Sequence, residues 1–258
     1  IGETLVKLIL KDKNNFELKL LTAAKNYKKL LKQAKLLNVK NIIITDKTAY
    51  LKSLKKNKNN INIYNNFDKL DKIFKSKIDY CMSSISGIAG LNPTFEMIKY
   101  SRTLAIANKE IIICGWNLLK KELKKNNTKF IPVDSEHFSI WFGLKGIDNY
   151  KIDKIYLTAS GGPLLNYPLN KFKNIKIATA LKHPNWKMGK KISIDSATMM
   201  NKVFEVIEAK NIFEIKYEQI KILIHQKSYI HALIKLNNGL IKIIAHDTNM
   251  KIPIFNTL

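Results

Sequence analysis

The feature of this sequence that most constrains its fold is a regular alternation of short apolar runs with helical patterns over residues 1 to about 132. Asn41–Thr45 holds three consecutive isoleucines, and a continuous β-branched run is typical of a strand buried on both faces. The preceding segment, Tyr27–Leu37, carries its apolar residues at helical spacing. Strands and helices that alternate with short connections predict βαβ units, and therefore a doubly wound parallel sheet of the nucleotide-binding kind.

The second half of the chain has a different sequence pattern. Four polar clusters interrupt it, at Asp134–His137, Ser160–Pro163, His183–Trp186 and Asp195–Thr198. Three strand-like segments follow, at Lys221–His225, Ile230–Lys235 and Leu240–Ala245. We therefore predict an α/β protein, with a Rossmann-like doubly wound parallel sheet in residues 1–133 and an α+β domain in residues 134–258.

The charge of the chain first points toward nucleic acid, because 45 basic residues against 20 acidic ones give a net charge of +25. However, Arg102 is the only arginine, so the other 44 basic residues are lysines spread along the whole chain. Nucleic-acid binders favour arginine for bidentate contacts to bases and phosphates. The composition therefore favours a solvated lysine-rich surface and predicts no nucleic-acid partner, with a basic nucleic-acid-binding protein as the alternative.

The hydrophobic pattern and the two cysteines indicate the cellular environment that we expect for the protein. No run of about 18 apolar residues is present, so we expect no transmembrane helix and no membrane partner. Cys81 and Cys114 stand alone, forming neither a disulfide framework nor a CxxC zinc motif. We expect a reducing compartment, the cytoplasm. The chain begins with Ile1 rather than Met, which leaves an upstream segment and a plastid-type organelle open.

Two carboxylates stand two residues apart just after a predicted strand, Asp134 and Glu136. On an extended backbone such residues point the same way, and two carboxylates in one space repel unless a cation lies between them. Carboxylate oxygens suit Mg²⁺ or Mn²⁺ rather than zinc. The alternative is a pair of solvated loop acids.

The following helix predicts an anion site beside a metal ligand. Asp195 or Ser196 is a candidate cap, and Asn201, Lys202 and Glu205 then share one helical face. With a hydroxyl at the positive end of the helix, this face is suited to an anion. An ordinary amphipathic helix with a lysine–glutamate pair is the alternative.

Two further loops have the composition of ligand-binding segments. Ser160–Pro163 places a Gly-Gly turn after a strand, which exposes N–H groups and a hydroxyl to a phosphate. His183–Gly189 combines a histidine, a tryptophan and a glycine in one polar loop, as in a lid over a small ligand. A tight turn and a surface loop with a buried tryptophan are the respective alternatives.

Taken together, these motifs resemble the 1-deoxy-D-xylulose 5-phosphate reductoisomerase family in content and order, over essentially the whole chain. The most specific strings are Asp195–Lys202 and His183–Trp186. Further matching segments are Ala107–Glu110, Pro132–His137, Leu157–Pro163, Glu205–Glu208 and Ile224–His231. The resemblance implies NADPH-dependent rearrangement and reduction of 1-deoxy-D-xylulose 5-phosphate to 2-C-methyl-D-erythritol 4-phosphate, in the non-mevalonate isoprenoid pathway.

The resemblance also implies roles for individual residues, with NADPH and a divalent metal, Mg²⁺ or Mn²⁺, as cofactors. The metal ligands would be Asp134, Glu136 and Glu205. The catalytic residues would be Lys109, Glu136, His183, Glu205 and His231. The substrate would contact Lys109, Ser135, Glu136, Ser160, His183, Trp186, Met188, Ser196, Asn201, Lys202 and Glu205. NADPH would contact Ile1, Ala24, Lys25, Asn26, Asn108, Glu110 and Gly189. Residues 1–133 would then bind NADPH and residues 134–258 the metal and substrate, and the family resemblance suggests a homodimer.

The sequence also departs from the family pattern. The family pattern has a glycine where this chain has Ala24, a serine where it has Ile111, and a glycine where it has Val203. Most of the family's glycine-rich start and its C-terminal helical domain are expected to be missing. These departures keep two alternatives open: an inactive or incomplete fragment of such an enzyme, and another NAD(P)-dependent sugar-phosphate oxidoreductase.

Overall fold

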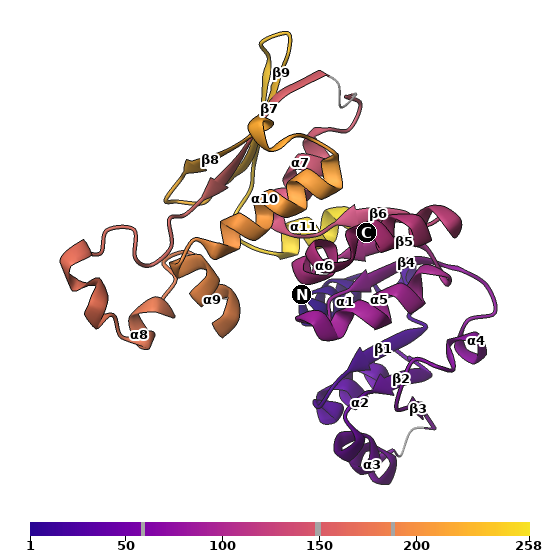
Figure 1. Cartoon of the computed structure of the whole chain (residues 1–258). Helices are drawn as coiled ribbons and strands as arrows, with labels where there is room; N and C mark the ends of the chain where they lie inside the picture. The colour runs from indigo at the N-terminus through magenta and orange to yellow at the C-terminus, as the bar shows by residue number, and fades with distance from the viewer. Residues whose placement is uncertain (58–59, 148–150, 187–188) are drawn as a thin grey trace. The chain divides into compact units, whose positions relative to one another are not determined.

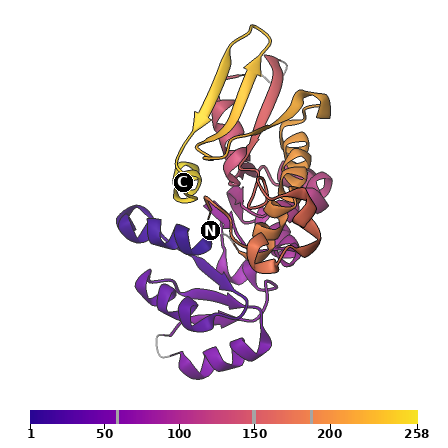
Figure 2. The same ribbon diagram turned by 90° about the vertical axis from the view of Figure 1, so that its left-hand side faces the viewer.

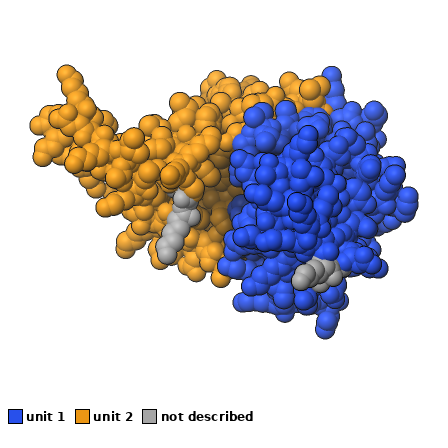
Figure 3. Space-filling model, turned by 90° about the horizontal axis from the view of Figure 1, so that it is seen from below, with its two compact units in different colours: residues 1–105, 120–130 blue, residues 106–119, 131–258 orange. Residues whose placement is uncertain are grey.

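The computed structural model describes residues 1–57, 60–147, 151–186 and 189–258 (Figure 1). It divides into two compact units, which Figure 3 colours separately. Unit 1 comprises residues 1–105 and 120–130, and unit 2 comprises residues 106–119 and 131–258. The assignment of cofactor binding to residues 1–133 and of catalysis to residues 134–258 stays a prediction.

Unit 1 contains a parallel sheet in the order β1-β2-β3, formed by Leu20–Ala23, Asn41–Ile44 and Asn62–Tyr64. The predicted isoleucine strand is confirmed, since the three isoleucines of β2 are fully buried. The helices that follow β1 and β2 begin where side chains cap them. Asn26 accepts a hydrogen bond from the N–H of Lys29 at the start of α2, and Asp46 accepts one from Ala49 at the start of α3.

A second sheet has the order β4-β5-β6. Its strands are Ile78–Ser83, Ser101–Ile106 and Lys129–Pro132. The helices of this half of the chain are α1 (Gly2–Lys11), α2 (Tyr27–Leu36), α3 (Lys47–Lys56), α4 (Leu70–Ile73), α5 (Leu91–Ile98) and α6 (Lys109–Lys125).

Unit 2 is built on a four-stranded mixed sheet in the order β10-β9-β7-β8, in which β7 and β8 are parallel and β9 is antiparallel to both neighbours. The strands are β7 (Ile152–Ala159), β8 (Ile220–Ile224), β9 (Ile230–Leu236) and β10 (Ile241–Ala245). The hairpin of β9 and β10 is visible in Figure 2. The helices are α7 (Ser135–Gly143), α8 (Ile177–Ala180), α9 (Lys190–Ala197), α10 (Met200–Phe213) and α11 (Lys251–Thr257).

The core of unit 2 lies between this sheet and two helices. Ile140 of α7 and Ala209 of α10 are fully buried against Ile155 of β7 and Ile234 of β9. Removal of this apolar surface from water anchors both helices, at roughly 25 cal/mol per Å². The amino-terminal turns of α7 and α10 are thereby held on one face of the sheet, and the candidate site forms there.

Strand β9 contains one extra residue opposite β10. Ile244 pairs with Ala232, but the next residue, Ala245, pairs with Ile230. His231 is therefore the bulged residue, and a β-bulge re-aims the side chain that it carries.

The predicted fold class is confirmed: the chain is α/β, with parallel strands in the N-terminal part and a mixed sheet after it. Among the described residues, every helix is too short or too polar to cross a bilayer.

Candidate active site

Three carboxylates from two helices meet in unit 2. Asp134 occupies the N-cap position of α7, Glu136 lies in the first turn of that helix, and Glu205 projects from α10. One oxygen of each lies within 4.8 Å of the others. The expectation of an extended backbone through Asp134 and Glu136 is wrong, because the chain becomes helical at Ser135. The start of the helix, rather than strand alternation, brings the two acids together.

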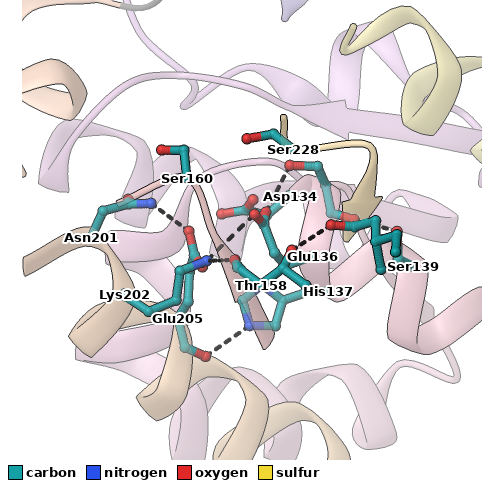
Figure 4. Close-up of polar contacts among 12 residues, drawn as sticks. Asp134, Glu136, His137, Ser139, Thr158, Ser160, Asn201, Lys202, Glu205 and Ser228 are labelled. Carbon is teal, nitrogen blue, oxygen red and sulfur yellow. Dashed lines mark hydrogen bonds and ion pairs between the residues drawn. The ribbon is translucent and has the colours of Figure 1, made fainter. Parts of the chain in front are cut away.

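Two buried lysines face these carboxylates (Figure 4 shows Lys202). Lys109 Nζ lies 2.8 Å from Asp134 Oδ2 and 3.5 Å from Glu205 Oε1, and it donates to Asn201 Oδ1 at 2.7 Å. Lys202 Nζ forms an ion pair with Glu205 and donates to the carbonyl of Thr158, with Glu136 Oε1 at 3.4 Å. The site is therefore a compact network of alternating charges.

A second layer of this network, His137 and Glu208, was not among the predicted site residues. His137 Nε2 lies 2.9 Å from the carbonyl oxygen of Glu205, and its Nδ1 lies 3.7 Å from Glu208 Oε2. Glu208 Oε2 is also 4.0 Å from Lys109 Nζ. The signal that could have found these residues is helical spacing, since each follows a predicted metal ligand by three positions on the same helix.

Burial and neighbouring charges shift the pKa values of the acids in opposite directions. Burial opposes ionisation of Asp134, but the ammonium of Lys109 brings its pKa below the ordinary range. Burial and the adjacent Glu136 raise the pKa of Glu205, against the pull of Lys202. Burial raises the pKa of Glu208 to about 7. The four carboxylates of this network outnumber its two ammonium groups, and this excess favours a further positive charge at this place.

The two lysines stay cationic in this environment. Burial disfavours the charged form of Lys109, but Asp134 and Glu205 raise its pKa well above the ordinary value. Burial likewise opposes the charge on Lys202, whereas Glu136 and Glu205 raise its pKa. Asp134, Glu136 and Glu205 each offer a carboxylate oxygen to the same small space. A set of oxygen donors alone fits a hard divalent cation.

The turn after β7 packs against the end of α9. Gly161 and Gly162 both have positive φ, at 84° and 71°, and a Cβ atom on Gly162 would lie 2.5 Å from the carbonyl oxygen of Ser196. The N–H of Gly162 donates to Ser160 Oγ at 3.1 Å. The structure thus brings together the turn of Ser160 and the segment of Ser196, two of the predicted phosphate-binding segments.

The expectation that Asp195 or Ser196 caps the helix of Glu205 is wrong. Helix α9 ends at Ala197, and Met199, with φ of 59°, turns the chain before α10 begins. On α10, Asn201 donates to Glu205 and Lys202 contacts Glu205 and Glu136, so both side chains face the carboxylates (Figure 4).

The predicted lid residues His183 and Trp186 lie near the same turn. His183 Nδ1 accepts from the N–H groups of Asn185 and Trp186, at 3.2 and 3.0 Å, so Nε2 carries the proton and donates to Ser160 Oγ at 3.0 Å. Burial lowers the pKa of His183, which favours this neutral form. Half-buried Trp186 meets the ring of His231 edge-on, with centroids 6.1 Å apart. Met188 lies outside the described residues.

The predicted NADPH contacts fall into two groups, one in each unit. In unit 1, Ile1 precedes α1, while Ala24, Lys25 and Asn26 are exposed directly after β1. In unit 2, buried Asn108 accepts from the N–H of Glu110 at 2.9 Å, Glu110 pairs with Lys191 at 2.9 Å, and Gly189 precedes α9 in open space. Ser135, a predicted substrate contact, donates to Glu136 at 2.7 Å.

Comparison with known proteins places these residues in a family. Residues 1–115 match the family model described as 1-deoxy-D-xylulose 5-phosphate reductoisomerase, and residues 130–213 match the model of its C-terminal domain. The curated reductoisomerase of Pelagibacter ubique is 60% identical over 261 residues, which cover all of this chain and 67% of the relative. That of Wolbachia pipientis wMel is 41% identical, over 98% of this chain and 65% of the relative.

Two solved structures resemble the whole described fold. The reductoisomerase of Zymomonas mobilis in complex with NADPH superimposes with a TM-score of 0.90 and 33% identity, covering 99% of this chain and 66% of its own. A DOX-P reductoisomerase in complex with NADPH, fosmidomycin and magnesium superimposes with a TM-score of 0.89 and 32% identity. This match covers 98% of the present chain and 65% of the other. The chain therefore spans about two thirds of the length of these relatives.

Proposed function

This chain belongs to the 1-deoxy-D-xylulose 5-phosphate reductoisomerase family, and we propose that it catalyses the family reaction. In that reaction 1-deoxy-D-xylulose 5-phosphate is rearranged and then reduced with NADPH to 2-C-methyl-D-erythritol 4-phosphate, within isoprenoid biosynthesis. The observation that carries the proposal is the convergence of Asp134, Glu136 and Glu205 beside the buried Lys109.

Asp134, Glu136 and Glu205 would hold the divalent metal, since magnesium accompanies fosmidomycin in a related structure. When bound, such an ion polarises a carbonyl and neutralises negative charge that develops on substrate oxygens. NADPH, which related structures contain, supplies the hydride. In unit 1 the exposed residues after β1, and in unit 2 the segment of Asn108 and Glu110, are proposed to contact it.

Lys109 is proposed to act on the substrate as a fixed cation. Asp134 and Asn201 hold its ammonium group at 2.8 and 2.7 Å, so its position does not depend on the substrate. A prepositioned cation in a water-poor site stabilises developing negative charge without reorganisation. Ser135, which donates to Glu136, is proposed to orient that carboxylate until substrate oxygens arrive.

The phosphate of the substrate is proposed to lie between the turn after β7 and the start of α10. Ser160 and Ser196 come from segments already in contact at Gly162. Asn201 and Lys202 would complete the site by exchanging their contacts with Glu205 for contacts with the phosphate. His183 and Trp186, together with Met188, are proposed to close over the substrate and exclude water during the rearrangement. His231 would lie beside the bound substrate.

Further parts of the proposal concern assembly and location. We propose a homodimer, because the edge strands β8 and β10 expose Ile222, Ile224, Ile241 and Ile243. We also propose a reducing compartment such as the bacterial cytoplasm, because Cys81 and Cys114 are free thiols and the similar curated proteins are bacterial.

The test is NADPH consumption by the purified chain with 1-deoxy-D-xylulose 5-phosphate and Mg²⁺ or Mn²⁺. We expect turnover that depends on both metal and substrate, with 2-C-methyl-D-erythritol 4-phosphate as the product. Turnover only with a different sugar phosphate would favour the alternative oxidoreductase. No NADPH consumption with either metal would favour the alternative of an inactive or incomplete fragment.

A further inference from the structure

Two histidines from neighbouring strands stack beside the candidate site. The rings of His231 and His246 are nearly parallel, 17° apart, with centroids separated by 3.7 Å. His231 is the bulged residue of β9, and His246 directly follows the end of β10. Trp186 meets the ring of His231 edge-on, with centroids 6.1 Å apart. The His231 ring therefore contacts two aromatic groups from separate parts of unit 2.

The backbone of His246 determines which nitrogen of His231 carries the proton. His231 Nε2 lies 3.2 Å from the carbonyl oxygen of His246. A carbonyl oxygen only accepts hydrogen bonds, so Nε2 must be protonated and donate. Burial, together with the neighbouring His246, lowers the pKa of His231 to about 4, so the ring is neutral near pH 7. In a neutral ring with Nε2 protonated, Nδ1 is an acceptor.

His246 is itself fixed from several directions. Its N–H donates to the carbonyl of Tyr229 at 2.8 Å, and its Nδ1 donates to the carbonyl of Asp247 at 2.8 Å. Its ring meets Phe138 of α7 edge-on at 6.3 Å, and its Nε2 lies 3.5 Å from Ser139 Oγ. The hydroxyl of Ser139 donates to the carbonyl of Ser135. In the sequence, Ser135 stands between Asp134 and Glu136. His246 therefore connects His231 to the helix that carries Asp134 and Glu136.

These contacts fix the tautomer of each ring. One nitrogen of each ring, Nε2 of His231 and Nδ1 of His246, faces a backbone carbonyl and is protonated there. The pair is therefore arranged to hold the His231 ring in one orientation and one tautomer. Second-layer groups that fix a histidine tautomer commonly decide what that histidine can do.

We propose that His246 is a positioning residue for His231: its ring stacks on the imidazole and its carbonyl keeps the proton on Nε2, so that Nδ1 accepts a hydrogen bond from a hydroxyl of the phosphorylated sugar. The inference rests on the proposed function. It assigns to His246 no contact with substrate, metal or NADPH. Its effect is transmitted only through the orientation of His231.

The test compares three variants of the full chain: His246→Ala removes the stacked ring, His246→Phe keeps an aromatic ring, and Thr248→Ala is a neighbouring control. We expect His246→Ala to lower kcat/KM for the sugar phosphate roughly tenfold, with an unchanged KM for NADPH, since small misplacement of a contact group costs up to about 100-fold. His246→Phe should retain activity within about twofold, and Thr248→Ala should match the wild type.

The second readout is the tautomer of His231, measured by nitrogen-15 NMR of histidine-labelled protein and assigned with His231→Gln. We expect a single Nε2–H tautomer in the wild type and in His246→Phe. In His246→Ala the carbonyl is retained, but without the stacked ring the His231 imidazole can turn away from it, so we expect a mixture of tautomers. Unchanged kinetics in His246→Ala would overturn the inference. Loss of activity with a lowered melting temperature and an unchanged His231 tautomer would equally overturn it. If the wild type shows no turnover, the proposed function fails, and the tautomer measurement alone decides whether His246 positions His231.

Discussion

Replacement of Gly162 by alanine tests whether the turn after β7 and the end of α9 form one rigid unit. At this position φ is 71°, in the left-handed region, where an L-residue costs roughly 1–2 kcal/mol. A Cβ atom would also lie 2.5 Å from the carbonyl oxygen of Ser196 and 3.0 Å from its carbonyl carbon. Because both neighbours are backbone atoms, the turn or α9 must move, and overpacking of this kind typically costs about 1–3 kcal/mol. We expect Gly162→Ala to lower the free energy of unfolding by about 2–5 kcal/mol.

The matched control is Gly239→Ala in the β9–β10 hairpin. Gly239 has φ of 86°, but a Cβ atom there would meet nothing within 4 Å. Gly239→Ala should therefore lower the free energy of unfolding only by the cost of a positive φ for an L-residue, about 1–2 kcal/mol. The difference between the two variants measures the close approach of Gly162 to Ser196.

The assay combines urea unfolding, followed by circular dichroism, with steady-state kinetics. Since the N–H of Gly162 donates to Ser160 Oγ, displacement of the turn should also raise the KM for the sugar phosphate, while Gly239→Ala should leave that KM unchanged. Equal losses of stability in the two variants, with equal KM values, would refute the reasoning. The turn would then not be packed against α9 in solution.

Three further predictions concern the charged and titrating groups of the site. Glu205→Gln should keep the fold but lower turnover by orders of magnitude at limiting Mg²⁺, because one charge of a three-carboxylate site is removed. Turnover is measured while Mg²⁺ is titrated, and full turnover of this variant would argue against Glu205 as a metal ligand. Lys202→Ala should strongly raise the KM for the phosphorylated substrate, leave NADPH affinity nearly unchanged, and cost about 3 kcal/mol of stability because buried carboxylates lose their partner. An equal loss of affinity for NADPH and substrate would assign this lysine to the cofactor. His231 has a folded pKa of about 4 against an ordinary 6.5, so the stability that it contributes is complete above pH 6.5 and is lost as the pH falls toward 4, by up to about 3 kcal/mol. Denaturant unfolding of the wild type and of His231→Gln over this range should therefore show a steeper acid loss in the wild type, and parallel curves would contradict the burial of a neutral ring.

Much of this protein could be predicted from its sequence, because the relevant signals are local. The strand β2 follows from its continuous isoleucine run, the helix before it from apolar residues at a spacing of about 3.6, and the strands of the second half from short strand-like segments. The same local strings, above all Asp195–Lys202 and His183–Trp186, carry the resemblance to the reductoisomerase family, which the comparisons support over the whole chain. The three carboxylates could be proposed as a set only because that resemblance connects two distant segments.

Only the tertiary structure decided how these segments meet. Local pattern predicted an extended Asp134–Glu136 pair, but packing of α7 on the mixed sheet placed both acids at a helix start opposite Glu205. Helical spacing places His137 and Glu208 three residues after two of the carboxylates, but the contact between them depends on the separation of two helices, which no spacing within one helix encodes. The contact between His231 and His246 depends on a one-residue bulge in the register of β9 against β10. Register and helix packing are set by the burial of whole faces at once, so they are properties of the folded chain and not of any short stretch of its sequence.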